Sequence, residues 1–203
     1  MPPYISIGGY SDPPRMSHLS VEVNKGEIVV VTGPPGSGKS NLIKSMAGIR
    51  RFIRGSIRIL GARAGTLRSR QGVVFVFQNW NFSPDLSVRI QLERKVGLYL
   101  GVPARAVRLT VDRWSEDLGL RDSLDFYPSQ LNRSDLQLLS LAPLALGRPA
   151  VAVLDEPMAN LSSVGVSMAM DLVLPVIGNG AVLALAQGRS PLVNRADRVL
   201  SLL

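Results

Sequence analysis

The sequence predicts an α/β fold, a mostly parallel, doubly wound sheet with a helical insertion. Short apolar runs bounded by glycine, proline or charged residues are typical of strands buried on both faces of a parallel sheet. Segments with helical patterning alternate with these runs, which favours an open sheet covered by helices. A helix-rich stretch at about 83–146 interrupts the alternation, and we interpret it as a helical subdomain inserted into a single domain over residues 1–203.

Each expected strand is a short run of residues that is rich in β-branched side chains or wholly apolar. They are Glu27–Val31, Ser56–Leu60, Val73–Phe77, Val151–Leu154 and Ala181–Ala186. The expected helices are Leu42–Met46, Ala104–Leu118 and Val164–Val176. The insertion separates the third of these strands from the fourth and carries many of the arginines.

Composition limits the classes of protein and site. Hydrophobic residues make up 46% of the 203 residues and charged residues 19%, enough apolar material for a buried core. The net charge of +8 is compatible with nucleic acid, an anionic membrane or phosphorylated ligands, or with a solvated arginine-rich surface. No motif interleaves aromatic residues with the arginines, so we expect no specific nucleic acid. The absence of cysteine and the single histidine, His18, exclude disulfides, thiolate metal sites and a histidine-based zinc site.

The apolar tracts of the chain are too interrupted to cross a membrane. Pro143 and Arg148 cut the tract Leu138–Leu154, and Pro175 cuts Leu172–Leu185. The first residues lack an apolar segment behind basic residues, so no secretory signal is visible. We therefore expect a cytoplasmic protein.

A phosphate-binding loop is the strongest motif. Residues 33–40, GPPGSGKS, fit the pattern G-x-x-x-x-G-K-[ST] at every fixed position. The loop follows an expected strand and precedes an expected helix, which argues against a chance glycine turn. Its backbone N–H groups curl around a phosphate, and the helix directs its positive end there. We expect Lys39 to reach the β- and γ-phosphates and the Ser40 hydroxyl to bind Mg²⁺. The expected nucleotide-binding residues are Gly33, Pro34, Pro35, Gly36, Ser37, Gly38, Lys39, Ser40 and Asn41.

Two carboxylates follow the expected strand Val151–Leu154. In phosphate-loop nucleotidases the aspartate at a strand end holds Mg²⁺, which assigns that role to Asp155. The adjacent Glu156 is placed to orient an attacking water or to accept its proton. The alternative is a solvated acidic pair, but the phosphate loop on the same chain favours a nucleotide site.

With these motifs present, the sequence resembles the ATP-binding subunits of ABC transporters over nearly its whole length. Val76-Phe77-Gln78-Asn79 is similar to the family's Q-loop, which implies that Gln78 contacts Mg²⁺ and the attacking water. Tyr10 lies 23 residues before Gly33, where the family has an aromatic residue that stacks on adenine. The alternatives are that Tyr4 has this role or that Tyr10 is an ordinary core tyrosine. Residues 127–131, YPSQL, are similar to the approach to the family signature, and residues 156–161, EPMANL, to the D-loop of the lipoprotein-release and macrolide-efflux branch.

The sequence departs from the family at its signature. Residues 131–135 read LNRSD where the family has Leu-Ser-Gly-Gly-Gln. Without the two glycines, Cβ atoms and the Arg133 side chain hinder close approach of the backbone to a phosphate. Asp135 adds negative charge there, whereas Asn132 or Ser134 can still cap a helix.

Four more family positions are changed. Leu138 and Pro143 replace arginines, and inside a helix Pro143 would cost about 3 kcal/mol or force a kink. Ser162 replaces the D-loop aspartate. Gln187 replaces the switch histidine; it can hydrogen-bond a γ-phosphate as part of the catalytic set but cannot become cationic. We interpret His18, far upstream, as structural or solvated.

The resemblance implies an ATPase that uses ATP and Mg²⁺ and drives a membrane permease. ABC sites form between two subunits, and the changed signature favours a heterodimer with a second ATP-binding subunit over a homodimer. The protein would lie on the inner face of the membrane, where anionic lipid attracts arginines. These include Arg89, Arg94, Arg105, Arg108, Arg113 and Arg121 of the insertion. Alternatives are a regulatory or structural ATP-binding module with little hydrolysis, or a soluble ABC-type protein acting on nucleic acid.

Overall fold

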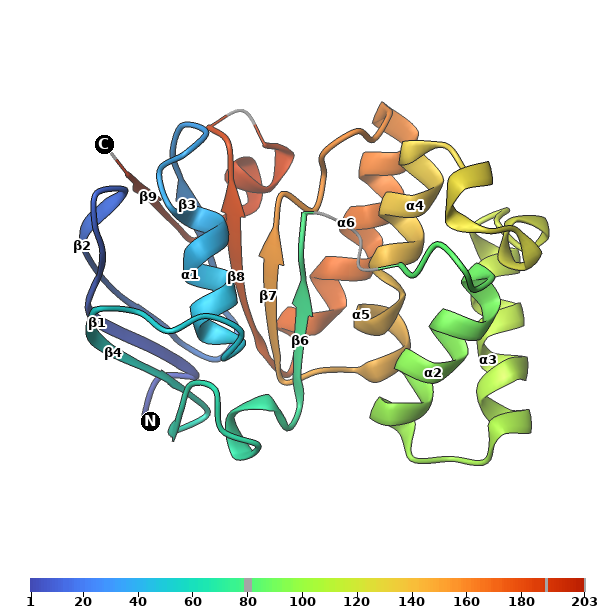
Figure 1. Cartoon of the computed structure of the whole chain (residues 1–203), viewed down its shortest axis with the longest axis horizontal. Coiled ribbons are helices and arrows are strands. Elements are labelled where there is room, and N and C mark those ends of the chain that lie inside the picture. Colours follow the sequence, from blue (N-terminus) through green and yellow to red (C-terminus); the bar gives the residue numbers. More distant parts are fainter. Residues whose placement is uncertain (79–81, 189, 203) are drawn as a thin grey trace.

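The computed structural model describes residues 1–78, 82–188 and 190–202, and within them two sheets and a group of helices (Figure 1). The larger sheet has the strand order β6-β7-β8-β3-β9, and every pairing in it is parallel. Its strands are β3 (Ile28–Thr32), β6 (Val73–Val76), β7 (Val151–Asp155), β8 (Ala181–Ala186) and β9 (Arg198–Ser201). The predicted α/β class with a mainly parallel sheet is confirmed.

The central strands of this sheet are buried at every position. This holds for β3, β7 and β8, whose sequences are almost wholly apolar. Helices cover one face and α1 (Lys39–Met46) covers the other, so neither face of these strands meets water. Because all the strands run in the same direction, the segments that follow β3, β6, β7 and β8 emerge at one edge of the sheet.

The second sheet is antiparallel, with the order β2-β1-β4-β5. Its strands are β1 (Ile5–Asp12), β2 (Met16–Val23), β4 (Arg54–Ile59) and β5 (Ala62–Arg63). The prediction that 56–60 forms a strand buried on both faces of the parallel sheet is therefore wrong. Ile57 and Ile59 of β4 are buried while Arg58 is exposed, the alternation of a sheet with one solvated face.

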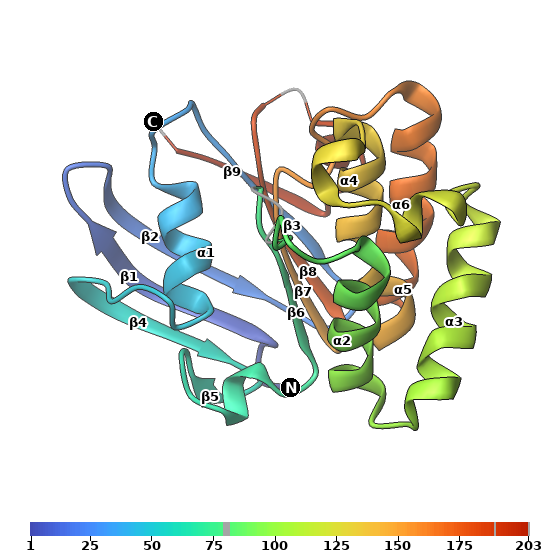
Figure 2. The ribbon, with the colours of Figure 1, turned by 45° about the vertical axis from the view of Figure 1, so that its right-hand side comes forward.

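Helix α1 packs between the two sheets (Figure 2). Leu42, Ile43 and Met46 are fully buried in a core that includes Ile57 of the antiparallel sheet and Leu183 of the parallel sheet. The expected helix Leu42–Met46 is thus the C-terminal part of α1. This packing fixes the start of α1 relative to the ends of the parallel strands.

The remaining helices lie on the other face of the parallel sheet, with α2 and α3 farthest from the antiparallel sheet (Figure 1). They are α2 (Val88–Leu100), α3 (Ala104–Asp117), α4 (Arg133–Ser140), α5 (Ala142–Gly147) and α6 (Ser163–Ile177). Short 3-10 segments complete the fold at Arg68–Arg70, Asp122–Asp125, Pro128–Gln130 and Pro191–Arg195. Among the described residues, no helix combines the length and apolar character needed to cross a membrane.

Pro143 lies in the first turn of α5 and not in a helix interior, so the expected kink or loss of a hydrogen bond does not arise. Helix α4 ends at Ser140, Leu141 caps it, and α5 begins at Ala142 with Pro143 in its first turn. A proline is tolerated at that position because the first N–H groups of a helix have no partner within the helix. The chain avoids the steric cost of the proline by ending one helix and starting another.

Candidate nucleotide-binding site

A cavity of about 300 Å³ lies at the carboxyl edge of the parallel sheet. Segments far apart in the sequence meet there: the phosphate loop, the end of β7, and the residues that follow β6 and β8. The structure brings together ten of the predicted site residues, namely Pro35, Gly36, Gly38, Lys39, Ser40, Asn41, Gln78, Asp155, Glu156 and Gln187. Among the described residues, Arg15 lines the cavity with them and was not predicted.

The phosphate loop connects β3 to α1, and its conformation depends on glycine. Gly36 has φ 86° and Gly38 has φ 94°, a backbone conformation that side chains with a Cβ rarely adopt. The backbone N–H of Ser37 donates to the Pro34 carbonyl over 3.2 Å and closes the turn. Gly33, Pro34 and Ser37 belong to the loop but do not line the cavity.

The Lys39 ammonium group is hydrogen-bonded to carbonyl groups of its own loop. Its Nζ donates to the carbonyl oxygens of Gly33, at 2.7 Å, and Pro34, at 3.0 Å. The residue is 7% exposed, so its charge lies against the loop and not in bulk water. An anion in the cavity would meet this charge together with the free N–H groups at the start of α1.

Asp155 is the buried end of β7, with 2% exposure. The Ser40 hydroxyl donates to its carboxylate, yet Oδ1 has no hydrogen-bond partner among the described residues. Burial raises the pKa of Asp155, against the effect of Ser40 and of the nearby Lys39 charge. A carboxylate oxygen without a partner, beside a hydroxyl and the Gln78 amide, is a set of oxygen donors that suits Mg²⁺. The residues present therefore fit this ion.

Glu156 follows in a strained conformation, with φ 51°. Its backbone N–H donates to the Leu185 carbonyl over 2.8 Å, which ties it to β8. The backbone N–H of Gln187 donates to the Glu156 carboxylate. Burial, the larger effect, nevertheless raises the pKa of Glu156. A carboxylate held in this way beside the cavity is a suitable proton acceptor.

Comparison with known proteins agrees with this geometry. A family model described as ABC transporter matches residues 16–159, which is more than half of the chain. The chain belongs to the ABC transporter family. The resemblance inferred from the motifs is therefore confirmed at the level of the family.

Several relatives of this chain are named as ATP-binding proteins of import systems. One, from Agrobacterium fabrum, is named sn-glycerol-3-phosphate import ATP-binding protein UgpC 2; it is 32% identical over 155 residues, which cover 76% of this chain and 41% of the relative. Another, from Haloferax volcanii, is named xylose/arabinose import ATP-binding protein XacK; it is 30% identical over 161 residues, which cover 79% of this chain and 42% of the relative. The matches thus span less than half the length of these two relatives. Neither is named for lipoprotein release or macrolide efflux, so that branch stays a prediction.

Solved ABC structures share the fold. An ATP-binding subunit of an ABC transporter superposes with a TM-score of 0.84 at 17% identity, covering 98% of this chain and 85% of that one. A dimeric ATP-binding cassette in a post-hydrolysis state, bound to ADP and Pi, superposes with a TM-score of 0.82 at 20% identity, covering 98% of this chain and 94% of that one.

The aromatic residue expected to stack on adenine is not at the cavity. Tyr10 is 0% exposed, its ring lies 5.6 Å from that of Phe52, and its hydroxyl is 3.3 Å from Ser45 Oγ. The prediction is wrong because the register of β1 shifts on both sides of Tyr10 and directs the ring into the core under α1. The alternative, Tyr4, packs partly buried against the same core and does not line the cavity.

The turn between β1 and β2 contributes two residues that the sequence reasoning missed. Arg15 lines the cavity, and the buried Asp12 lies behind it. Asp12 accepts hydrogen bonds from Asn41 Nδ2 at 2.6 Å and from Arg50 at 3.0 Å. Asn41, an expected ligand contact, thus lines the cavity while its side-chain amide is bound to Asp12. The polar run SDPPR between two apolar strands was the available signal.

The ABC signature region lies elsewhere, and none of its residues lines the cavity. Asn132 Oδ1 accepts the backbone N–H of Asp135 at the start of α4, and Asn132 Nδ2 donates to the Asp135 carboxylate, each over 2.9 Å. Of the two candidate caps, Asn132 therefore serves. Ser162, in place of the D-loop aspartate, caps α6 by accepting the N–H of Gly165.

Two other predicted features have simple outcomes. His18 is exposed on β2 beside Ser20, as expected of a solvated side chain. Asn79, part of the sequence that is similar to the Q-loop, lies outside the described residues.

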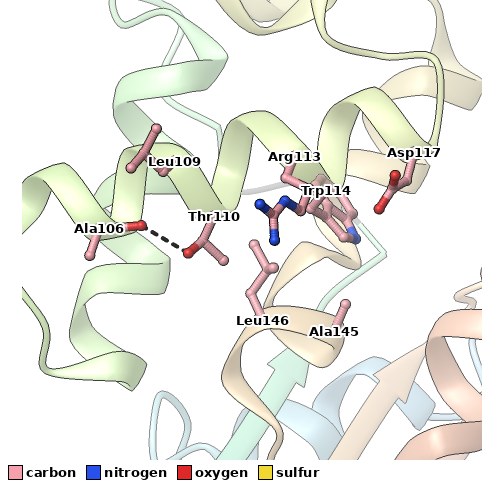
Figure 3. Close-up of a pocket in the computed structure, with 8 residues that line it drawn as sticks. All are labelled: Ala106, Leu109, Thr110, Arg113, Trp114, Asp117, Ala145 and Leu146. Atoms are coloured by element: carbon pink, nitrogen blue, oxygen red, sulfur yellow. Dashed lines mark hydrogen bonds between the residues drawn. The ribbon is translucent and has the colours of Figure 1, made fainter.

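A second cavity, of about 470 Å³, lies between α3 and α5 (Figure 3). Its lining is mainly apolar, and Arg113 and Asp117 are its charged residues. Trp114 is 7% exposed there, and its indole Nε1 has no hydrogen-bond partner among the described residues. It contains no predicted site residue. The lining residues are Ala106, Leu109, Thr110, Arg113, Trp114, Asp117, Ala145 and Leu146.

Proposed function

We propose that this chain is the ATP-binding subunit of an ABC transporter and couples ATP binding and hydrolysis to a membrane permease. The observation that carries the proposal is that Lys39, Ser40, Asp155 and Glu156 line one cavity at the edge of the parallel sheet. The names of the relatives, which are ATP-binding proteins of import systems, support a role in transport.

Each lining residue has a role in this proposal. The loop N–H groups and the Lys39 ammonium bind the phosphates of ATP, and Ser40, Asp155 and Gln78 hold Mg²⁺. When bound, this ion neutralises charge on the β- and γ-phosphate oxygens. Glu156 orients the attacking water and accepts its proton, and its raised pKa brings its basicity closer to the working pH.

Gln187 takes a place that the family gives to histidine. It lies exposed directly after β8, on the rim of the cavity. Its side-chain amide can donate to a γ-phosphate oxygen, but it has no cationic form. In this proposal Gln187 helps to position the phosphate, and the negative charge that develops is offset by Lys39 and Mg²⁺.

The closed N-terminus of α4 supports an asymmetric pair. The Asp135 carboxylate lies in the first turn of α4 and Asn132 caps the helix, so both side chains stand where a nucleotide phosphate would bind. The partner in our proposal is a second ATP-binding subunit with an intact signature, and the ATP held by this chain would meet that signature. A dimeric cassette with the same fold supports pairing as such.

We further propose that residues 83–146 form the helical subdomain of a single ABC-type domain and that its exposed arginines face the permease and the inner membrane surface. Arg94, Arg105, Arg108 and Arg113 are exposed. Arg89, expected among them, is not, because it is paired with Asp112 and Asp125 and its side chain is 13% exposed.

A regulatory ATP-binding module with little hydrolysis is the second candidate. It is favoured by Gln187 and by the closed start of α4. Both candidates bind ATP, and they differ in whether Glu156 is needed for turnover.

The deciding experiment is single-turnover ATP hydrolysis by the purified chain, alone and mixed with a candidate second ATP-binding subunit of the proposed pair. We expect Glu156→Gln to lower the rate in the mixed complex about 10²–10⁴-fold with nucleotide binding retained. Glu116→Gln, the same change on the exposed part of α3, is the control and should have no effect. Equal rates for Glu156→Gln and the wild type would refute the catalytic assignment and favour the regulatory module.

Asymmetry has its own test. The combined substitutions Asn132→Ser, Arg133→Gly, Ser134→Gly and Asp135→Gln open the start of α4. We expect the Glu156→Gln chain with these changes to form an ATP-dependent homodimer by size-exclusion chromatography, and Glu156→Gln alone to stay monomeric. An ATP-dependent homodimer of Glu156→Gln alone would contradict the preference for a heterodimer.

A further inference from the structure

The turn between β1 and β2 is anchored to the start of α1 by a buried carboxylate. Asp12 is 2% exposed and accepts hydrogen bonds from Asn41, on α1, and Arg50, which follows it. Burial acts against ionisation, but the hydrogen bonds from Arg50 and Asn41 hold the pKa of Asp12 below its usual range. The Arg15 N–H donates to the Asp12 carbonyl over 3.2 Å and completes the turn. The position of Arg15 is therefore fixed relative to the phosphate loop.

Arg15 is exposed and lines the cavity from this turn. A Cβ built on Gly38 would lie 3.4 Å from the Arg15 Cβ, so the stem of the arginine packs against the end of the loop. The ion pairs found among the described residues do not involve Arg15. Its guanidinium group is thus available to a bound molecule.

The turn and the strand β7 lie on opposite sides of the start of α1 in both views (Figures 1 and 2). Asp155 and Glu156, at the end of β7, mark the side of the terminal phosphate in the proposed function. A nucleotide with its terminal phosphate there extends its base towards the turn. Arg15 lines the cavity from this turn, Gly38 packs beside it, and Asn41 is bound to Asp12 at the end of β1.

No aromatic side chain lines this cavity in the part of the chain that the structure describes. Tyr10, the aromatic residue nearest to Arg15 in the sequence, is buried in the core. A guanidinium group is planar and stacks on aromatic faces, where its charge is attracted by the ring electrons. It can therefore contact a base in the absence of a tyrosine or tryptophan.

We propose that Arg15 binds the nucleotide by stacking its guanidinium group on the base, in place of an aromatic residue. The proposal rests on the proposed function, since it requires a nucleotide in the cavity. Stacking depends on a ring face and not on the exocyclic groups of one purine. The site should therefore bind ATP and GTP with similar affinity.

The test measures the Kd of ATP, GTP and inorganic tripolyphosphate by calorimetry, with Mg²⁺, for the wild type, Arg15→Ala and Arg15→Lys. We expect Arg15→Ala to weaken ATP and GTP alike by about fivefold, as expected for a contact of ~1 kcal/mol, and to leave tripolyphosphate unchanged. Arg15→Lys keeps the charge but not the plane, so it should not restore binding fully. Arg51→Ala removes another exposed arginine, away from the cavity, and is the matched control.

Each outcome has one meaning. An equal loss for tripolyphosphate would show that Arg15 contacts phosphate and would overturn the stacking proposal. Unchanged affinities in Arg15→Ala would overturn any contact with the ligand. A wild-type chain that binds none of the three ligands would instead refute the proposed function itself.

Discussion

The starts of α1 and α4 are both loop-to-helix junctions, yet one is open to a phosphate and the other is closed. At α1 the cap is Gly38, which has no side chain to occupy the free N–H groups. At α4 the Asn132 side chain accepts one of those N–H groups and holds the Asp135 carboxylate beside it. Helix geometry offers the same partial positive charge at both ends. The side chains around each N-terminus therefore decide whether an external anion can use it.

Among substitutions that test the difference between the two helix starts, we expect the largest change in ATP affinity at Lys39. The Lys39→Ala variant removes a charged donor from the α1 side, and hydrogen bonds to charged groups contribute up to about 3 kcal/mol, so we expect the Kd of ATP to rise about 100-fold. Lys25→Ala removes the charge of an exposed lysine in the turn before β3, outside the cavity, and should leave the Kd of ATP unchanged. Fluorescence titration with a labelled ATP analogue measures both. A small effect of Lys39→Ala would mean that the loop amides alone bind the phosphates.

We expect a smaller change in ATP affinity at Asp155, the proposed Mg²⁺ ligand beside the start of α1. Metal binding requires the deprotonated carboxylate, and burial raises the pKa of Asp155 above its ordinary value of 3.8. We therefore expect the Mg²⁺-dependent part of ATP affinity to fall on acidification, starting at a higher pH than for an exposed aspartate. In Asp155→Asn this part should drop about tenfold and lose the share of the pH dependence that comes from this carboxylate, while the share that comes from the terminal phosphate of ATP remains.

Titrations of ATP affinity from pH 5 to pH 8, with Mg²⁺ and with EDTA, separate the effect of Mg²⁺ from the effect of pH. Asp171→Asn, the same change at an exposed position of α6 that does not line this cavity, is the matched control. The contribution of Asp155 is the difference between the pH profiles of the wild type and Asp155→Asn, because the terminal phosphate of ATP titrates in both. Profiles of the same shape would contradict the assignment to Asp155.

The smallest effect is expected at the closed junction. The Asn132→Ala variant removes the cap of α4 and should lower the free energy of unfolding by about 1 kcal/mol, with no change in ATP affinity. Ser134→Ala changes a neighbour that does not cap the helix and should have little effect. Denaturant melts give the stability. A change in the Kd of ATP for Asn132→Ala in the isolated chain would break the separation between the two junctions.

Local patterns made much of the site predictable. The phosphate loop and the strand before Asp155 have fixed spacings, and a parallel sheet necessarily places the ends of β7 and β8 at one edge. The side of Tyr10 was not predictable because two register shifts in β1 decide it, and these depend on its partners β2 and β4. Arg15 lies in a turn without periodicity, and β9 becomes a strand only by pairing with β3.

The Lys39 ammonium group, bound to two carbonyl oxygens of its own loop, makes ligand binding an exchange. An incoming anion competes with the Gly33 and Pro34 carbonyls for the same donors. A single inorganic phosphate offers few new contacts in return, whereas a polyphosphate also reaches the loop amides along its length. We therefore expect the loop to bind single small anions weakly. A polyphosphate should bind more tightly, because its contacts with the loop amides compensate for the hydrogen bonds that Lys39 loses.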